Sequence, residues 1–219
     1  MELTYYGHSC FSLKTKAGTV LFDPYESGTL GLTLPKLEAD IVCVSHDHAD
    51  HNAVSAIGGN PLVLDWPGEF EKNDIRVRGF STFHDKAQGA ERGGNIMFEV
   101  SWNGIHLLHA GDLGDMPSAE VLSEVDTTHV LMVPVGGHFT INAEEAIKLI
   151  KKIEPSIVIP MHYKSEKHTG VVAEKLADVS EFLKHMGADD AQEVEKLVLK
   201  KEELNAETTR VVLMKSMIK

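Results

Sequence analysis

The sequence predicts an α+β fold in which two stacked β-sheets are covered by outer helices. Three observations predict it. Short runs of β-branched and aromatic residues recur along the 219 residues, helical patterns separate these runs in the second half, and no linker or repeat divides the chain. Because this length suits one sizeable core, we expect a single domain over residues 1–219.

The expected strands are short and end in polar or turn-forming residues. The polar, glycine-containing stretch 84–95 separates two of them and is expected to be a mobile loop. In the first half the strands are residues 3–6, 10–14, 19–22, 41–45, 61–64 and 75–82. In the second half they are residues 96–100, 105–109, 129–133, 157–160 and 209–214.

Two amphipathic helices are expected in the second half. The first opens at Asn142, a favourable N-cap, and runs to Ile153, shortly before Pro155. The second ends at Gly187, in the usual position after a helix C-terminus. Its apolar spacing predicts contact with the core rather than with a cofactor. The residues that carry this spacing are Val172, Leu176, Val179, Leu183 and Met186.

Composition narrows the range of partners. The 33 acidic and 21 basic residues give a net charge of −12. Because this negative charge repels the phosphate backbone of nucleic acids, no nucleic-acid partner is expected. Neither a basic, apolar start nor an apolar run of about 18 residues occurs, so no membrane partner is expected. Cys10 and Cys43 stand in strand-like segments typical of buried free thiols. We therefore expect a reduced chain and a cytoplasmic location.

A cluster of potential metal ligands directly follows the apolar run that ends at Val44. His46 and His48 can converge on one ion, whereas Asp50 and His51 are displaced along the chain and can face a second. Imidazole and carboxylate donors without a thiolate suit zinc, and also iron, manganese or cobalt. This segment therefore predicts two neighbouring metal sites.

Further candidate ligands stand at the ends of other predicted strands. They are His84, Asp112 and His162, and their repeated placement predicts that they converge at one edge of the sheets.

These motifs resemble those of the metallo-β-lactamase superfamily, and within it the short predicted zinc-dependent hydrolases related to ascorbate-phosphate lactonases. The resemblance covers nearly the whole chain. It is carried by residues 45–52, 67–71, 109–114, 134–137 and 159–163.

The resemblance implies a four-layer αββα sandwich and two Zn²⁺ ions per chain, with Mn²⁺ or Fe²⁺ as alternatives. It also implies that Asp23 accepts a hydrogen bond from the free ring N–H of a ligand histidine, although an Asp-Pro turn is the alternative. The implied ligands are His46, His48 and His84 for one ion, Asp50, His51 and His162 for the other, and Asp112 as the bridge. His109 competes with His84 as the third imidazole of the first site, and His84 is favoured because the family has His109 as a neighbour of the bridging Asp112.

The expected function is hydrolysis of a small-molecule ester, lactone, amide or phosphodiester by a metal-bridging hydroxide that Asp50 and Asp112 orient. Two alternatives stay open, a diiron redox enzyme on the same fold and a metal-binding module without catalysis. His48 opposes the first, since diiron oxidoreductases of the family usually carry glutamate there. The sequence carries no indication of oligomeric state.

Two further residues are candidates for contact with substrate. Arg92 belongs to the segment 85–95, whose glycines suit a lid, and it could pair with an anionic group; a solvated connection is the alternative. His138 follows a glycine and is a candidate for substrate binding or proton transfer. His8 is a weaker candidate of the same kind, because a histidine in a glycine-flanked turn is commonly structural.

Overall fold

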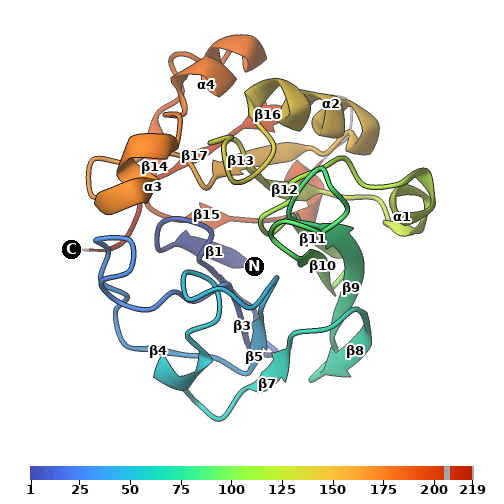
Figure 1. Ribbon diagram of the computed structural model, residues 1–219. Helices are drawn as coiled ribbons and strands as arrows, with labels where there is room; N and C mark the ends of the chain where they lie inside the picture. The colour runs from blue at the N-terminus through green and yellow to red at the C-terminus, as the bar shows by residue number, and fades with distance from the viewer. Residues whose placement is uncertain (205–207, 219) are drawn as a thin grey trace.

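The computed structural model describes residues 1–204 and 208–218. It contains two large sheets that face each other across one core (Figure 1). The first sheet has six strands in the order β15, β1, β2, β3, β5, β7. Their bounds are β1 Glu2–Tyr5, β2 Phe11–Lys14, β3 Thr19–Phe22, β5 Ile41–Cys43, β7 Leu62–Leu64 and β15 Leu197–Val198.

The second sheet has seven strands in the order β16, β13, β12, β11, β10, β9, β8. The strands β11, β12, β13 and β16 are parallel, and β10, β9 and β8 continue the sheet in antiparallel pairs. Their bounds are β8 Gly68–Lys72, β9 Ile75–Phe83, β10 Gly94–Trp102, β11 Ile105–His109, β12 Val130–Pro134, β13 Ile157–Met161 and β16 Arg210–Val211.

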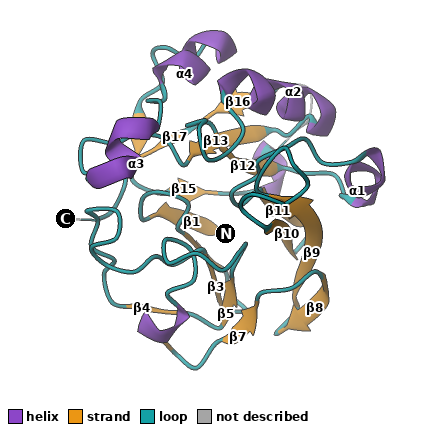
Figure 2. Cartoon of the chain, viewed as in Figure 1, coloured by secondary structure: helices purple, strands orange, loops and turns teal. Residues whose placement is uncertain are grey.

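Successive side chains of a strand point to opposite faces of the sheet, and apolar side chains pack into a core on both faces of the first sheet. Val20 and Phe22 of β3 face the second sheet, whereas Leu21 faces outward. The outer cluster includes Tyr25 and Leu32 from the loop after β3. The 3-10 helix η1 (Val54–Ala56) lies on this side, beside a small sheet of β4 (Leu37–Glu38) and β6 (Ile57–Gly58) (Figure 2).

Helices cover the outer side of the second sheet. Figure 1 shows α2 (Ala143–Ile153) and α4 (Ser180–Met186) on the side of β12 and β13 that faces away from the first sheet. The predicted start of α2 is confirmed, since Asn142 and Glu145 form a capping box. The expected sandwich of two sheets between outer layers is therefore the observed fold.

The second predicted helix is wrong as one continuous element. It is divided into α3 (Gly170–Lys175) and α4, and the chain between them is held by tertiary hydrogen bonds. Ala177 donates its N–H to the carbonyl of Gly136 (2.9 Å), and its own carbonyl accepts from the N–H of Lys164 (2.8 Å). These bonds replace helical ones, so an uninterrupted apolar spacing did not give an uninterrupted helix.

Other differences concern short elements. The strand expected at 209–214 divides at Val212 into β16 and β17 (Leu213–Met214), and β17 pairs with β14 (Glu193–Val194) in a separate small sheet. The sequence did not predict α1 (Ala119–Glu124), η1 and η2 (Lys201–Glu203), nor the strands β4, β6, β8, β14 and β15.

Strand direction determines where the candidate site lies. In the first sheet β3, β5 and β7 are parallel, and β1 runs in the same direction because two antiparallel pairings separate it from β3. In the second sheet β9 likewise runs with β11, β12 and β13. A membrane-crossing helix, which needs about 20 apolar residues, is absent from residues 1–204 and 208–218.

Candidate metal centre

The candidate ligands follow the C-terminal ends of four strands. His46, His48, Asp50 and His51 lie in the loop after β5. His84 directly follows β9, Asp112 follows β11 and His162 directly follows β13. The structure brings all of these residues together at one edge of the two sheets.

The first group of imidazoles consists of His46, His48 and His84. Each offers a ring nitrogen within 4.8 Å of those of the other two. Nε2 of His46 lies 3.0 Å from Nδ1 of His48, and the ring of His84 lies 4.6 Å from the ring of His46. Three imidazoles converging in this way are a suitable donor set for zinc.

Asp112 lies between this group and the next. Its Oδ2 is 3.6 Å from Nε2 of His84, 3.3 Å from Nε2 of His51 and 3.0 Å from Nε2 of His162. One carboxylate oxygen thus contacts imidazoles from both predicted sites, which is the position that a bridging ligand requires. Asp50 is half-buried, with its Oδ2 3.8 Å from Nε2 of His51.

The environment of Asp112 fits a bound cation. The carboxylate is buried, and all of its ion pairs in the described part of the chain are with imidazoles. Nε2 of His51 is also buried, and its 3.3 Å contact with Oδ2 of Asp112 lacks hydrogen-bond geometry. Because a buried charge and a buried polar atom without a hydrogen bond are both unfavourable, these residues suit a positive ion among them.

Neighbouring charges and burial shift the pKa values of the carboxyl and imidazole groups in the cluster. His162 and His51 hold the pKa of Asp112 well below its ordinary value, although burial opposes this. Burial lowers the pKa of His46 to about 3, which leaves its imidazole neutral and able to coordinate. The pKa of His51 is raised well above its ordinary value, since Asp112 and Asp23 overcome the opposing effect of burial.

A second set of residues orients the candidate ligands. Oδ2 of Asp23 lies 2.9 Å from Nδ1 of His51, and the same carboxylate accepts hydrogen bonds from the N–H and hydroxyl of Ser45 (2.8 and 2.7 Å). The Ser45 hydroxyl also lies 3.0 Å from Nδ1 of His46. These contacts leave the Nε2 atoms of both histidines facing the centre.

His109 lies outside the cluster. Its Nε2 is 2.9 Å from the carbonyl of Ser9, its Nδ1 accepts from the N–H of Gly111 (3.2 Å), and its ring stacks on Phe22. With both ring nitrogens engaged, His109 is placed as a buried structural residue, and His84 occupies the position beside His46. His138 does not reach the cluster either; its ring packs edge-on against Phe139.

A cavity of about 340 Å³ opens above the cluster. Asp50 and His48 of the cluster line it, together with Arg92, Phe139 and Val171. Val172 also lines the cavity, although it packs against the outer cluster of the first sheet as its apolar spacing predicted.

The segment after His84 is an ordered turn in this structure. The Asp85 carboxylate accepts hydrogen bonds from the backbone N–H groups of Ala87, Gly89, Glu91 and Arg92, at 2.7 to 3.0 Å. Four such bonds to one carboxylate hold the backbone in a fixed shape. The expected loop therefore forms a hydrogen-bonded wall of the cavity, and β10 begins at Gly94 within it; its mobility stays a prediction.

Three residues contact the candidate ligands but were not predicted from the sequence to belong to the metal centre. His8 lies beside His51 and His162, Ser45 contacts both Asp23 and His46, and Asn95 accepts the backbone N–H of Asp112 through Oδ1 (2.8 Å). His8 also follows the end of a predicted strand, and this signal could have identified it.

Comparisons with known proteins agree with this geometry. A family model described as the beta-lactamase superfamily domain matches residues 2–162. A UPF0173 metal-dependent hydrolase of Thermoplasma acidophilum is 30% identical over 187 residues, covering 74% of this chain and 83% of that protein. Another, from Carboxydothermus hydrogenoformans, is 30% identical over 210 residues, covering 83% of this chain and 90% of that protein.

A solved structure extends the likeness to nearly the full length. It is the structure of a Thermotoga maritima protein assigned as a predicted Zn-dependent hydrolase of the metallo-β-lactamase superfamily. The two chains are 33% identical, each is covered to 97%, and the TM-score is 0.80. The chain therefore belongs to the metallo-β-lactamase superfamily, as a metal-dependent hydrolase.

Proposed function

We propose that this hydrolase acts on a small ester, lactone, amide or phosphodiester with two zinc ions. The observation that carries the proposal is the position of Asp112, whose Oδ2 lies within 3.6 Å of His84 on one side and of His51 and His162 on the other. The first ion would be held by His46, His48 and His84, the second by Asp50, His51 and His162, and Asp112 would bridge them.

The chemistry of the reaction divides between the ions and the chain. Bound divalent ions polarise a carbonyl or phosphoryl oxygen and lower the pKa of water towards about 7. The chain holds the ligands rigidly through Asp23 and Ser45, and burial keeps the imidazole of His46 neutral. Asp50 lines the cavity, where its carboxylate can accept a hydrogen bond from the attacking water.

Protein nucleophiles are poorly placed for this reaction. The hydroxyl of Ser45 is buried and donates to Asp23, and that of Ser9 is buried and lies 3.5 Å from Oδ1 of Asp112. Both cysteines are buried free thiols. None of these residues lines the cavity, so water is the nucleophile that the site favours.

The cavity supports a small substrate with an anionic group. A volume of about 340 Å³ is at the lower end of the usual range for small-molecule sites. Arg92 supplies the positive charge in its wall, and Phe139 and Val171 supply apolar surface. A substrate could therefore place its scissile bond over Asp50 and an anionic group beside Arg92.

Elemental analysis and a substrate screen test the proposal. We expect close to two zinc ions per chain after reconstitution, and hydrolysis of at least one of the four substrate classes that stops when a chelator removes the metal. A reproducible content of one ion would contradict the dinuclear centre. Two iron ions in the protein as isolated, without hydrolysis, would instead favour the diiron redox alternative.

A further inference from the structure

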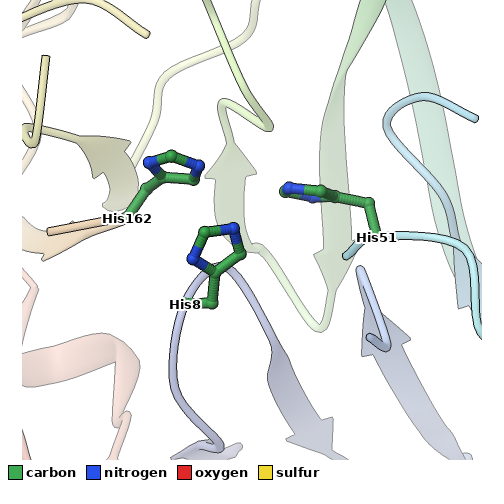
Figure 3. A group of neighbouring side chains, drawn as sticks. All are labelled: His8, His51 and His162. Carbon is green, nitrogen blue, oxygen red and sulfur yellow. The ribbon is translucent and has the colours of Figure 1, made fainter. Parts of the chain in front are cut away.

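His8 lies in the turn between β1 and β2 and brings another imidazole to the second group of candidate ligands. Figure 3 shows its ring between His51 and His162. One ring nitrogen of each of these three residues lies within 4.8 Å of those of the other two. The ring centroid of His8 is 4.0 Å from that of His162 and 5.2 Å from that of His51.

The side chain of His8 has no satisfactory polar partner among the described residues. It is 1% exposed, and neither of its ring nitrogens makes a hydrogen bond. Nε2 lies 3.3 Å from Oδ2 of Asp50, but this contact lacks hydrogen-bond geometry. A buried imidazole without hydrogen-bond partners is unfavourable, so a bound ion or molecule that contacts the ring nitrogens would stabilise His8.

The backbone holds the His8 ring at this place. His8 has a φ of +55°, a left-handed conformation that is uncommon for residues other than glycine. Its carbonyl accepts the N–H of His162 (2.9 Å) and the hydroxyl of Tyr5 (3.0 Å). The turn is thus bonded directly to the backbone of a proposed metal ligand. Such conformations persist where the surrounding structure fixes them, and they often mark functional sites.

Strand direction explains why His8 reaches the cluster. β1 runs in the same direction as β3 and β5, so the turn after β1 lies at the same edge of the sheet as the loop after β5. His8 therefore occupies the same kind of position as His51, His84 and His162, each of which follows the C-terminal end of a strand.

We propose that His8 is a further ligand of the second metal ion, which would then be held by the imidazoles of His8, His51 and His162 together with the carboxylates of Asp50 and the bridging Asp112. This arrangement repeats the three imidazoles of the first site. The inference rests on the proposed dinuclear centre. The competing role is that His8 only positions Asp50 through a hydrogen bond from Nε2.

Cobalt titration of the metal-free protein tests the proposal with the variant His8→Asn. Asparagine tolerates the left-handed conformation, so the variant removes the imidazole while keeping the turn. The matched control is His138→Asn, because His138 also follows a glycine, has a φ of +53° and lies outside both imidazole groups. Circular dichroism checks that each variant is folded.

Visible absorption of bound Co²⁺ and proton NMR of the shifted imidazole N–H signals are the measurements. We expect the unsubstituted protein to bind two ions. His8→Asn should bind the first ion normally and the second at least about 10-fold more weakly, with one shifted signal lost. His138→Asn should retain both affinities and all shifted signals.

A second ion that binds more weakly to His8→Asn while every shifted signal is retained would show that His8 only positions Asp50, and would overturn ligation. Three other outcomes are also decisive. Unchanged affinity for the second ion in a folded His8→Asn protein would overturn the role of His8 and leave the dinuclear centre intact. Fewer than two ions in the unsubstituted protein would overturn the dinuclear centre itself, and the role of His8 with it. If His8→Asn does not fold, a zinc-loaded crystal structure of the unsubstituted protein decides: ligation requires a His8 nitrogen about 2.0–2.1 Å from the second ion, and a longer distance overturns it.

Discussion

Nδ1 of His51 lies 2.9 Å from Oδ2 of Asp23, and this contact determines which nitrogen of His51 faces the metal centre. With Nδ1 bound to the carboxylate, Nε2 is directed to Asp112, 3.3 Å away. Carboxylates in this position commonly orient a ligand histidine and increase its basicity. Asp23 was expected in this role only through the family resemblance, and the structure supplies the contact.

We expect Asp23→Asn to weaken zinc binding by about 10- to 100-fold, because the amide cannot hold the imidazole as a carboxylate does. Competition with a chromophoric chelator measures this affinity. Asp47→Asn is the control, since Asp47 lies in the same loop as His51 with its side chain exposed. Equal affinities of the Asp23→Asn and unsubstituted proteins would show that the contact does not matter for metal binding.

Asp112→Ala and His162→Ala should each reduce kcat/KM by more than about 100-fold, since even outer-shell partners contribute about 10- to 100-fold. The fold should be retained, because both side chains lie at the sheet edge. Activity and circular dichroism are measured on the same samples, with His185→Ala on the exposed face of α4 as the control. An Asp112→Ala protein with full turnover and two bound ions would refute the bridging role.

Removing the metal should lower thermal stability. An ion that binds only the folded chain stabilises it by about 4 kcal/mol at a free concentration about 1,000 times its Kd. For a domain of this size that corresponds to a decrease of roughly 8–16 °C in Tm after chelation. Differential scanning calorimetry with and without chelator measures the change, and readdition of zinc should reverse it. Identical Tm values would show that the cluster does not bind zinc tightly.

Both thiols should be unreactive in the folded protein near pH 8. Burial, and then the negative charge of Asp23, raise the pKa of Cys10 and of Cys43 well above the ordinary value, so the thiolate is scarce. Ellman's reagent should therefore detect two thiols only after denaturation. One reactive thiol in the native state would contradict the burial, and none after denaturation would show a disulfide.

The geometry of the cysteines also shows what local sequence can predict. Both were expected to be buried free thiols, and the structure confirms this. Cys43 faces the core between the sheets, whereas Cys10 belongs to the cluster on the outer side of the first sheet. Strand alternation determines burial locally, but only the pairing of β2, β3 and β5 places the two thiols on opposite faces.

The features that could not be predicted from the sequence depend on contacts between residues far apart in the chain. The strands that precede His46, His84, Asp112 and His162 were predicted because their β-branched, aromatic and other apolar residues lie close together in sequence, in contiguous runs or, before His84, alternating with polar residues. The interruption between α3 and α4 depends on bonds from Ala177 to distant segments. The importance of His8 likewise depends on neighbours from β5 and β13, which its local turn does not reveal.

The turn that follows Asp85 was not predicted, although the local sequence contains a signal for it. An aspartate at the start of a loop commonly accepts the N–H groups that follow it, so a structured turn could have been predicted from Asp85. The glycines favoured a mobile lid instead. In the structure the hydrogen bonds to Asp85 hold this segment, and the ammonium of Lys86 pairs with Glu145 of α2.

Arg92 is the residue of this wall for which substrate kinetics give the clearest test. It lines the cavity together with Asp50, and its Cζ lies 5.7 Å from the centroid of the Phe139 ring. A hydrogen bond to a charged group contributes about 1.5–3 kcal/mol, so Arg92→Ala should raise KM for an anionic substrate by about 10- to 150-fold. If Arg92 binds the ground state and the transition state equally, kcat should stay nearly unchanged.

Lys86→Ala is the matched control for Arg92→Ala, because Lys86 carries the same charge in the same segment but does not line the cavity. A neutral analogue of the substrate should show no difference between the Arg92→Ala and unsubstituted proteins, since it offers no charge to pair with. Unchanged KM for the anionic substrate would mean that the guanidinium faces solvent, and that substrate charge is recognised at another part of the cavity.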